Sequence, residues 1–359
     1  MSLLTASRTA GKLSAMHLYV DYPSFLSPYI IPSLGIRWYS VMYLVAFTVA
    51  YLVMRLERRK GLISISDDDM YSLFVWGIGM LLLGARLGSV LIYNDDRLYY
   101  LLHPWMIFWP FENGQFVGLP GMSFHGGVVG GVTGIFIFCR RSQKKARLAA
   151  QKLRGRKKEK AFKGYGFFQI TDVFLPAIAL GYTFGRIGNF LNLELYGRVT
   201  DSPIGMIFPQ AGKLSTSLEW VREIADKVGI SYTAGEYLNL PRYPSQLFEA
   251  FFEGVLLFVI LWFFIGPLAR RKRPDRPGMI SGWWLILYGV FRFFIEYLRE
   301  PDSNLGYVIS LGNSDGPIEL FESMLNFSMG QILCAMMIIA GILMIVLTGH
   351  RKDLQGDIK

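Results

Sequence analysis

Two arginines stand in segments of the chain that are otherwise apolar. Arg186 belongs to GRIGNFLNLELYGR at 185–198, and Arg292 belongs to LYGVFRFFIEYLREPD. A guanidinium stays charged in apolar surroundings and binds a phosphate through two parallel hydrogen bonds. An arginine in the middle of a membrane helix costs about 2.5–3.5 kcal/mol, so it is retained where it faces a cavity, a partner charge or an anionic ligand. We therefore expect both arginines to hold a phosphate group, with interhelical ion pairs as the alternative.

A histidine, His125 in MSFHGGVVGGVTG, is the only one of four that falls within an apolar segment. A neutral imidazole can accept a proton from an incoming nucleophile. The alternative is a histidine that only satisfies a hydrogen bond. No cluster of His, Cys and carboxylates has the spacing of metal ligands, and there is no glycine-rich nucleotide loop. We therefore expect a chemistry that needs no metal and binds no nucleotide through such a loop.

Further polar side chains repeat at helical spacing inside the apolar segments. Residues three or four positions apart lie on one face of a helix. The sets that share a face by this rule are Arg186 with Asn189; Gln246 with Glu249 and Glu253; and Tyr288 with Arg292, Glu296 and Arg299. The spacing predicts that several helices direct polar groups toward one place.

The elements that position these groups are predicted to be membrane helices. The chain has 359 residues, of which 52% are hydrophobic and 18% charged. Apolar blocks of spanning length, about 20 residues, fall at 33–54, 70–93, 118–139, 170–192, 244–266, 279–298 and 328–348. They predict an all-α polytopic membrane protein with seven transmembrane helices. Cys139 and Cys334 both fall in apolar runs, where we expect small buried hydrophobes.

The positive charges predict the orientation of the helices. Four segments, 55–60, 140–163, 270–276 and 351–359, hold 24 of the 37 Lys and Arg residues. Positive charge marks the cytoplasmic side, so the N-terminus is expected outside and the C-terminus in the cytoplasm. The net charge of +10 is explained by this topology, and nucleic acid is not an expected partner.

The predicted parts are an N-terminal extracytoplasmic segment 1–32, a catalytic domain 33–348 and a cytoplasmic tail 349–359. The catalytic domain includes a basic cytoplasmic loop 140–165 and an extracytoplasmic subdomain 193–243. Within the subdomain, 218–229 is predicted to be a short amphipathic helix.

With this orientation, the polar residues of all seven spans fall in the outer half of the bilayer. They are Tyr39, Arg86, His125, Arg186, Asn189, Gln246, Glu249, Arg292, Glu296 and Gln331. A phosphate at that depth is expected to be a phospholipid headgroup. For Arg86 a packing role is as well supported as a functional one. Glu194 and Arg198 are expected to pair with other groups at the outer rim.

Seven ordered motifs resemble the prolipoprotein diacylglyceryl transferase family of bacteria. They are IRWYSVMYL, GARLGSVLIY, MSFHGGVVGG, GRIGNFLNLELYGR, YPSQLFEA, YGVFRFFIEYLREPD and MGQ, and they cover about residues 33–348. The resemblance implies an enzyme of the bacterial cytoplasmic (inner) membrane whose active site faces the outer leaflet. Its partners would be phosphatidylglycerol and the signal peptide of a prolipoprotein with its lipobox cysteine. The diacylglyceryl group would pass to the cysteine thiol, forming a thioether and releasing glycerol phosphate, without a cofactor or a metal.

The resemblance also implies roles for single residues. His125 matches the family's proposed base, and Arg186 and Arg292 match the arginines that hold the phosphate. Tyr39 matches a further catalytic position. The positions that match phosphatidylglycerol-binding residues are Arg186, Asn189, Glu194, Gly197, Tyr288, Arg292 and Glu296. A thiolate held by the arginines without a histidine base remains an open alternative.

Two other classes of protein would use the same residues differently. A transporter for an anionic solute should show internal repeats and polar groups near the midplane, and neither is present in the sequence. A structural scaffold would have no need for three arginines and a histidine inside the membrane. The lipid transferase is the preferred hypothesis.

Overall fold

The computed structural model describes residues 19–112, 114–116, 121–155, 157, 161–272, 277–300, 307–312 and 325–350. The chain is mostly helical. Within these ranges, six helices are long and apolar enough to cross a membrane. They are α1 (Trp38–Arg59), α2 (Asp67–Ile92), α6 (Phe167–Leu191), the continuous helix Ser245–Arg271 that comprises α8 to α10, α11 (Met279–Ile295) with its extension to Leu298, and α12 (Met329–His350). The protein is therefore a helical, multi-pass membrane protein.

The predicted span 118–139 corresponds to the first part of α4 (Phe124–Gln151). The helix begins only at Phe124 and becomes basic from Arg140 onward, so its apolar part is shorter than a span. The count of seven transmembrane helices stays a prediction. The expected basic loop 140–165 is wrong in its first half, because the helix continues to Gln151. Its Arg, Lys, Gln, Leu and Ala residues all favour helix, which explains the continuation.

The chain divides into two compact units. The first unit comprises residues 1–50, 178–272 and 282–359, and the second comprises 51–177 and 273–281. Helices α1, α6 and α11 each have residues in both units.

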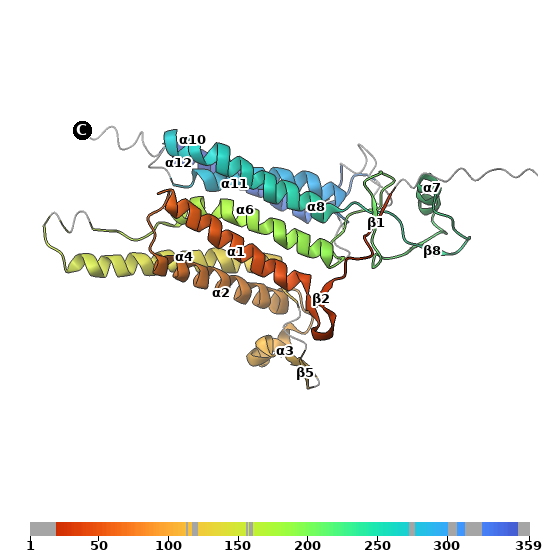
Figure 1. Cartoon of the computed structure of the whole chain (residues 1–359), viewed down its shortest axis with the longest axis horizontal. Coiled ribbons are helices and arrows are strands. Elements are labelled where there is room, and N and C mark those ends of the chain that lie inside the picture. Colours follow the sequence, from red (N-terminus) through yellow and green to blue (C-terminus); the bar gives the residue numbers. More distant parts are fainter. Residues whose placement is uncertain are drawn as a thin grey trace, which may run out of the picture. The chain divides into compact units, whose positions relative to one another are not determined.

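In the second unit, α2 and α4 lie side by side along their lengths (Figure 1). Glycines on one face of α4, at Gly126, Gly130 and Gly134, press against the backbone of α2. A side chain at any of them would collide with a carbonyl of α2. This close packing of small residues allows two membrane helices to approach without an apolar driving force from water. Short elements follow α2: α3 (Arg97–Leu102), η2 (Pro104–Phe108), and the paired strands β4 (Phe111–Glu112) and β5 (Gln115–Phe116).

Replacing Gly130 by alanine should destabilise this helix pair, because the new methyl group would collide with the carbonyl of Met80. We expect a loss of about 1–3 kcal/mol, the range for overpacked sites, seen as a lower midpoint of thermal unfolding in detergent micelles. Gly131→Ala is the matched control, since the nearest atoms there belong to the Leu81 side chain at 3.9 Å. Equal effects of the two substitutions would contradict this account of the packing.

In the first unit, pairs of helices also meet at glycines. Gly181 of α6 packs on Ala46 of α1, and Gly282 of α11 packs on Gly341 of α12. Both cysteines of the chain, Cys139 in the second unit and Cys334 in the first, are buried free thiols, as predicted. Helix α12 begins with a reciprocal cap. The Gln331 amide donates to Ser328 Oγ at 3.2 Å, while Gln331 Oε1 accepts from the Ser328 amide at 3.0 Å, which satisfies two free donors of the helix start.

Short strands lie before α1, in the long segment between α6 and α8, and after α11, and that long segment also carries one helix. The strands pair as β1 (Val20–Asp21) with β6 (Met206–Ile207), β2 (Tyr29–Ile31) with β3 (Ile36–Arg37), β7 (Leu214–Ser215) with β8 (Tyr237–Leu238), and β9 (Tyr307–Ile309) with β10 (Phe327–Ser328). Helix α7 (Glu219–Val228) confirms the predicted amphipathic helix. Its apolar face, formed by Val221, Ile224, Ala225 and Val228, is buried in a small core with Leu238 and Leu240.

Candidate active site

Three arginines of the first unit converge on one carboxylate, Glu249. Oε2 of Glu249 lies 2.7 Å from Arg186 Nε, while Oε1 lies 2.9 Å from Arg292 Nη1 and 2.6 Å from Arg299 Nη1. Glu249 is fully buried, with no exposed surface. Four residues from three separate stretches of chain therefore form one cluster, here called the arginine cluster.

Local helix geometry brings these residues together. The i, i+4 spacing predicted for Arg292 and Glu296 places Arg292 Nη2 3.0 Å from Glu296 Oε2. Glu249 ends α8 (Ser245–Glu249), and Glu253 lies in the π-helical turn η3 (Ala250–Leu256) that follows. A π turn inserts an extra residue into the helix and is frequently found at functional sites. The π turn thus falls where the buried carboxylates of Glu249 and Glu253 face Arg186 of α6 and Arg292 of α11.

Two further carboxylates complete the charge balance. Besides Arg292, Glu296 contacts Arg299 Nε at 3.5 Å and accepts a hydrogen bond from Ser328 Oγ at 3.0 Å. Glu253 lies 3.6 Å from Arg292 Nη1. Within the described residues, three guanidinium groups thus face three carboxylates. The side chains of the three arginines keep 11 to 15% of their surface exposed, so they are not fully buried.

Tyr182 is a member of the cluster that sequence reasoning missed. Its ring lies under the Arg186 guanidinium at 4.8 Å, and its hydroxyl accepts from Arg186 Nε at 2.6 Å. The same hydroxyl donates to Glu253 Oε2 at 2.8 Å. Its ring meets Tyr288 edge-on, with centroids 6.0 Å apart. The available signal was its position four residues before Arg186, on the same helix face.

Asn189 and Glu194 form the rim of the cluster, next to Arg186. Arg186 Nη1 is 3.5 Å from Asn189 Oδ1, and Asn189 Nδ2 donates to Glu194 Oε1 at 2.8 Å. The residues on either side of Glu194, Leu193 and Leu195, have left-handed backbones with φ of 59° and 56°. Non-glycine residues rarely adopt this conformation, which costs free energy and persists only where surrounding contacts fix it.

Side chains of α8 provide those contacts. Gln246 Nε2 donates to the Glu194 carbonyl at 2.7 Å, and Ser245 Oγ donates to the Leu195 carbonyl at 3.1 Å. The turn that presents Glu194 is therefore held by the same helix that supplies Glu249.

Gly197 and Tyr39 are the remaining predicted site residues of the first unit. A side chain at Gly197 would collide with the Leu298 carbonyl and with Tyr243, so close backbone packing explains the glycine. Its predicted contact with lipid stays a prediction. Tyr39 Oη lies 2.9 Å from Tyr43 Oη. Arg198, predicted to pair at the rim, hydrogen-bonds through Nη2 to the Tyr307 hydroxyl.

His125 lies in the second unit, in the first turn of α4. Ser123 caps this helix by accepting the Gly126 amide at 3.1 Å. Nδ1 of His125 is 3.0 Å from the hydroxyl of Tyr93, at the end of α2. The imidazole is exposed, so it can reach another molecule.

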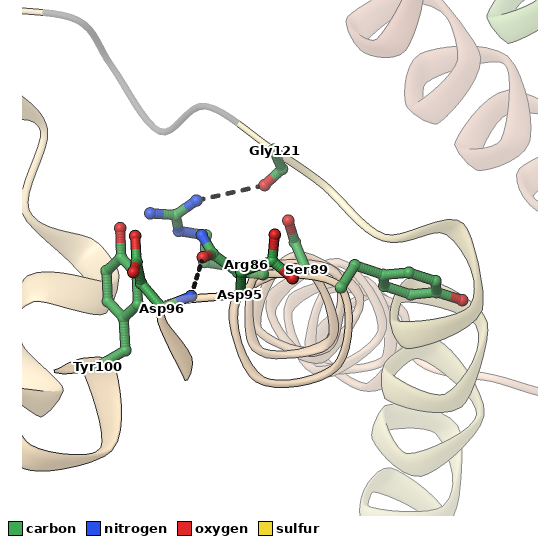
Figure 2. A pocket seen from close by; sticks show the side chains of 8 residues that line it. Arg86, Ser89, Asp95, Asp96, Tyr100 and Gly121 are labelled. Carbon is green, nitrogen blue, oxygen red and sulfur yellow. Dashed lines mark hydrogen bonds between the residues drawn. The ribbon is translucent and has the colours of Figure 1, made fainter. Parts of the chain in front are cut away.

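Arg86, also in the second unit, is buried and bonded to backbone carbonyls. Its Nε donates to Ile107 O at 2.6 Å, and its Nη1 lies 3.4 Å from Gly121 O. These bonds favour the packing role considered for this arginine. Arg86 also lines a cavity of about 450 Å³. Figure 2 shows six of the lining residues with labels: Arg86, Ser89, Asp95, Asp96, Tyr100 and Gly121.

Among the residues that the structure describes, no three or more His, Cys, Asp or Glu side chains are grouped so as to hold a metal ion. The arginine cluster is instead suited to an anionic ligand, because guanidinium groups recognise phosphate oxygens.

The geometry defines a membrane protein with a buried, arginine-rich polar cluster, and comparison with known proteins identifies the family. The family model for prolipoprotein diacylglyceryl transferase matches residues 28–347, and the chain belongs to this family. The chain is 43% identical to a phosphatidylglycerol–prolipoprotein diacylglyceryl transferase of Treponema denticola, over 95% of this chain and 98% of the relative. It is 44% identical to the Treponema pallidum protein of that name, over 94% and 98%, and 38% identical to that of Chlorobaculum tepidum, over 92% and 93%. The chain is accordingly a membrane-bound transferase.

Proposed function

We propose that this protein transfers the diacylglyceryl group of phosphatidylglycerol to the lipobox cysteine of prolipoproteins, the first step of lipoprotein maturation. The names of its relatives specify this lipid and this protein substrate. The observation that carries the proposal is the convergence of Arg186 and Arg292 on one buried carboxylate inside apolar helices. Ionisable residues inside a membrane are costly and by default mark a functional site.

The reaction requires one bond to form and one to break. The cysteine sulfur attacks the glyceryl carbon that carries the phosphate ester, and the carbon–oxygen bond breaks. Glycerol phosphate leaves with the electron pair, and a thioether remains. Arg186 and Arg292 would bind the phosphate and stabilise the charge that develops on the leaving oxygen.

His125 would remove the thiol proton. A free thiol has a pKa of about 8.5, so only a small fraction is thiolate at neutral pH, and a nearby base raises that fraction. Asn189, Glu194, Gly197, Tyr288 and Glu296 would bind the lipid headgroup together with the arginines. Tyr39 is proposed to act beside them in catalysis.

The distribution of basic residues supports a site near the outer leaflet of the bacterial cytoplasmic membrane. With the basic segments 55–60, 140–163, 270–276 and 351–359 in the cytoplasm, the arginine cluster falls in the extracytoplasmic half of the bilayer. Phosphatidylglycerol and the exported prolipoprotein would both be accessible there.

The test is a transfer assay with purified protein, phosphatidylglycerol and a lipobox peptide, without added metal or cofactor. We expect the peptide cysteine to gain the mass of one diacylglyceryl group in mass spectrometry. His125→Ala should slow this reaction by about 10²–10⁴-fold, the contribution of a general base. A peptide that remains unmodified by the parent protein would refute the function, and full activity of His125→Ala would refute its role as the base.

A further inference from the structure

Tyr93 contacts one of the two ring nitrogens of His125. The inference drawn from this contact rests on the proposed function, in which His125 is a base. In the described part of the chain, the Tyr93 hydroxyl lies 3.0 Å from Nδ1 of the imidazole. Tyr93 is the last residue of the motif GARLGSVLIY, and the proposed mechanism does not use it.

A neutral imidazole carries one proton, on either Nδ1 or Nε2, and the partner of one nitrogen fixes the state of the other. If Tyr93 donates to Nδ1, then Nε2 carries the proton and cannot act as a base. If Tyr93 accepts from Nδ1–H, the lone pair of Nε2 is free to take a proton from a thiol. A phenolic oxygen can play either part.

The surroundings of Tyr93 allow it to accept. Its side chain is largely exposed at the end of α2, so the phenolic proton can be donated to water or to a lipid headgroup while the oxygen accepts from the histidine. We propose that Tyr93 is a positioning residue that holds His125 in the Nδ1–H form and leaves Nε2 as the proton acceptor.

The backbone around this contact is held in place on both sides. The Ser123 amide, at the start of α4, donates to the Ala85 carbonyl of α2 at 2.8 Å. The glycine contact between Gly84 and Gly126 lies beside it. Both residues therefore stand on a tightly packed helix pair, which fixes the backbone positions from which their side chains meet.

The proton position can be measured directly by ¹⁵N NMR on histidine-labelled protein. His17→Gln, His103→Gln and His350→Gln leave His125 as the only labelled imidazole, since the chain has four histidines. In this parent protein, without substrate, we expect a protonated Nδ1 and an unprotonated Nε2. Adding Tyr93→Phe should shift the signals toward the Nε2–H form.

The same substitution should lower kcat for transfer by about ten- to hundred-fold, as for other residues that orient a functional histidine. The KM for phosphatidylglycerol should stay unchanged, since Tyr93 is not proposed to touch the lipid. Tyr100→Phe is the matched control. It removes a hydroxyl from the wall of the same cavity, and it should alter neither the tautomer nor kcat.

Two results would overturn the inference while leaving the transferase intact: an Nε2–H form in the active parent protein, or identical ¹⁵N signals with and without the Tyr93 hydroxyl. A parent protein that performs no transfer would refute the proposed function, and the role of this contact with it.

Discussion

Glu249→Gln should abolish measurable transfer and also weaken the folded protein. The carboxylate of Glu249 is within 2.9 Å of three guanidinium groups, so its removal leaves like charges facing one another in a buried place. Breaking a buried ion pair by removing one partner costs about 3–5 kcal/mol. We expect a transfer rate at least about 100-fold lower, equivalent to about 2.7 kcal/mol, and a lower midpoint of thermal unfolding in detergent micelles.

Two other substitutions make this prediction specific. Glu253→Gln should have a smaller effect, because among the described residues Glu253 has one guanidinium within 4 Å, that of Arg292 at 3.6 Å. Glu223→Gln removes an exposed carboxylate from α7 and should leave both rate and stability unchanged. If Glu249→Gln behaved like Glu223→Gln, the three arginines would not depend on their shared partner, and the described site would be wrong.

Helical periodicity was enough to predict which polar residues share a face. Arg292 and Glu296 are in contact, as are Arg186 and Asn189, although the latter pair is separated by 3.5 Å. These contacts lie within one helix or its immediate extension, where spacing alone determines neighbours.

Contacts between helices were not predictable in the same way. The sequence placed Glu249 in the polar layer but gave no reason to choose it over Gln246 or Glu253 as the common partner. That choice depends on the π turn after Glu249 and on how α6 and α11 pack around it. A π turn leaves no periodic signal in a single sequence, because it adds one residue to an otherwise regular helix.

The left-handed backbone of Leu193 and Leu195 was unpredictable for a related reason. Leucine gives no local indication of positive φ, which is normally a property of glycine or asparagine. The conformation is imposed by hydrogen bonds from Ser245 and Gln246, some 50 residues further along the chain. The same holds for the extent of α4, where the basic composition indicated the side of the membrane but not the helix that carries it.

Arg186→Lys and Arg292→Lys should each reduce transfer strongly even though the positive charge is retained. Arg186 uses Nε toward both Tyr182 and Glu249, and its Nη1 reaches Asn189. A lysine ammonium is a single point of charge and cannot reproduce this planar set of donors or bind a phosphate through two parallel hydrogen bonds. We expect kcat/KM to fall about 10²–10³-fold in each variant, the loss typical of one oxyanion-stabilising group.

The lysine variants distinguish two explanations for arginine at positions 186 and 292 inside the membrane. If only the net charge matters, lysine should preserve the transfer rate, and the site would act as a simple counter-charge for the lipid headgroup. If geometry matters, the rate should fall while thermal unfolding changes little, because lysine still balances Glu249. Arg147→Lys, on an exposed part of α4, serves as the control for the substitution itself and should retain full activity. If the rate falls in the Arg186 and Arg292 variants but not in Arg147→Lys, phosphate recognition explains why arginine occupies these two positions in the membrane. A purely structural ion pair would accept either cation.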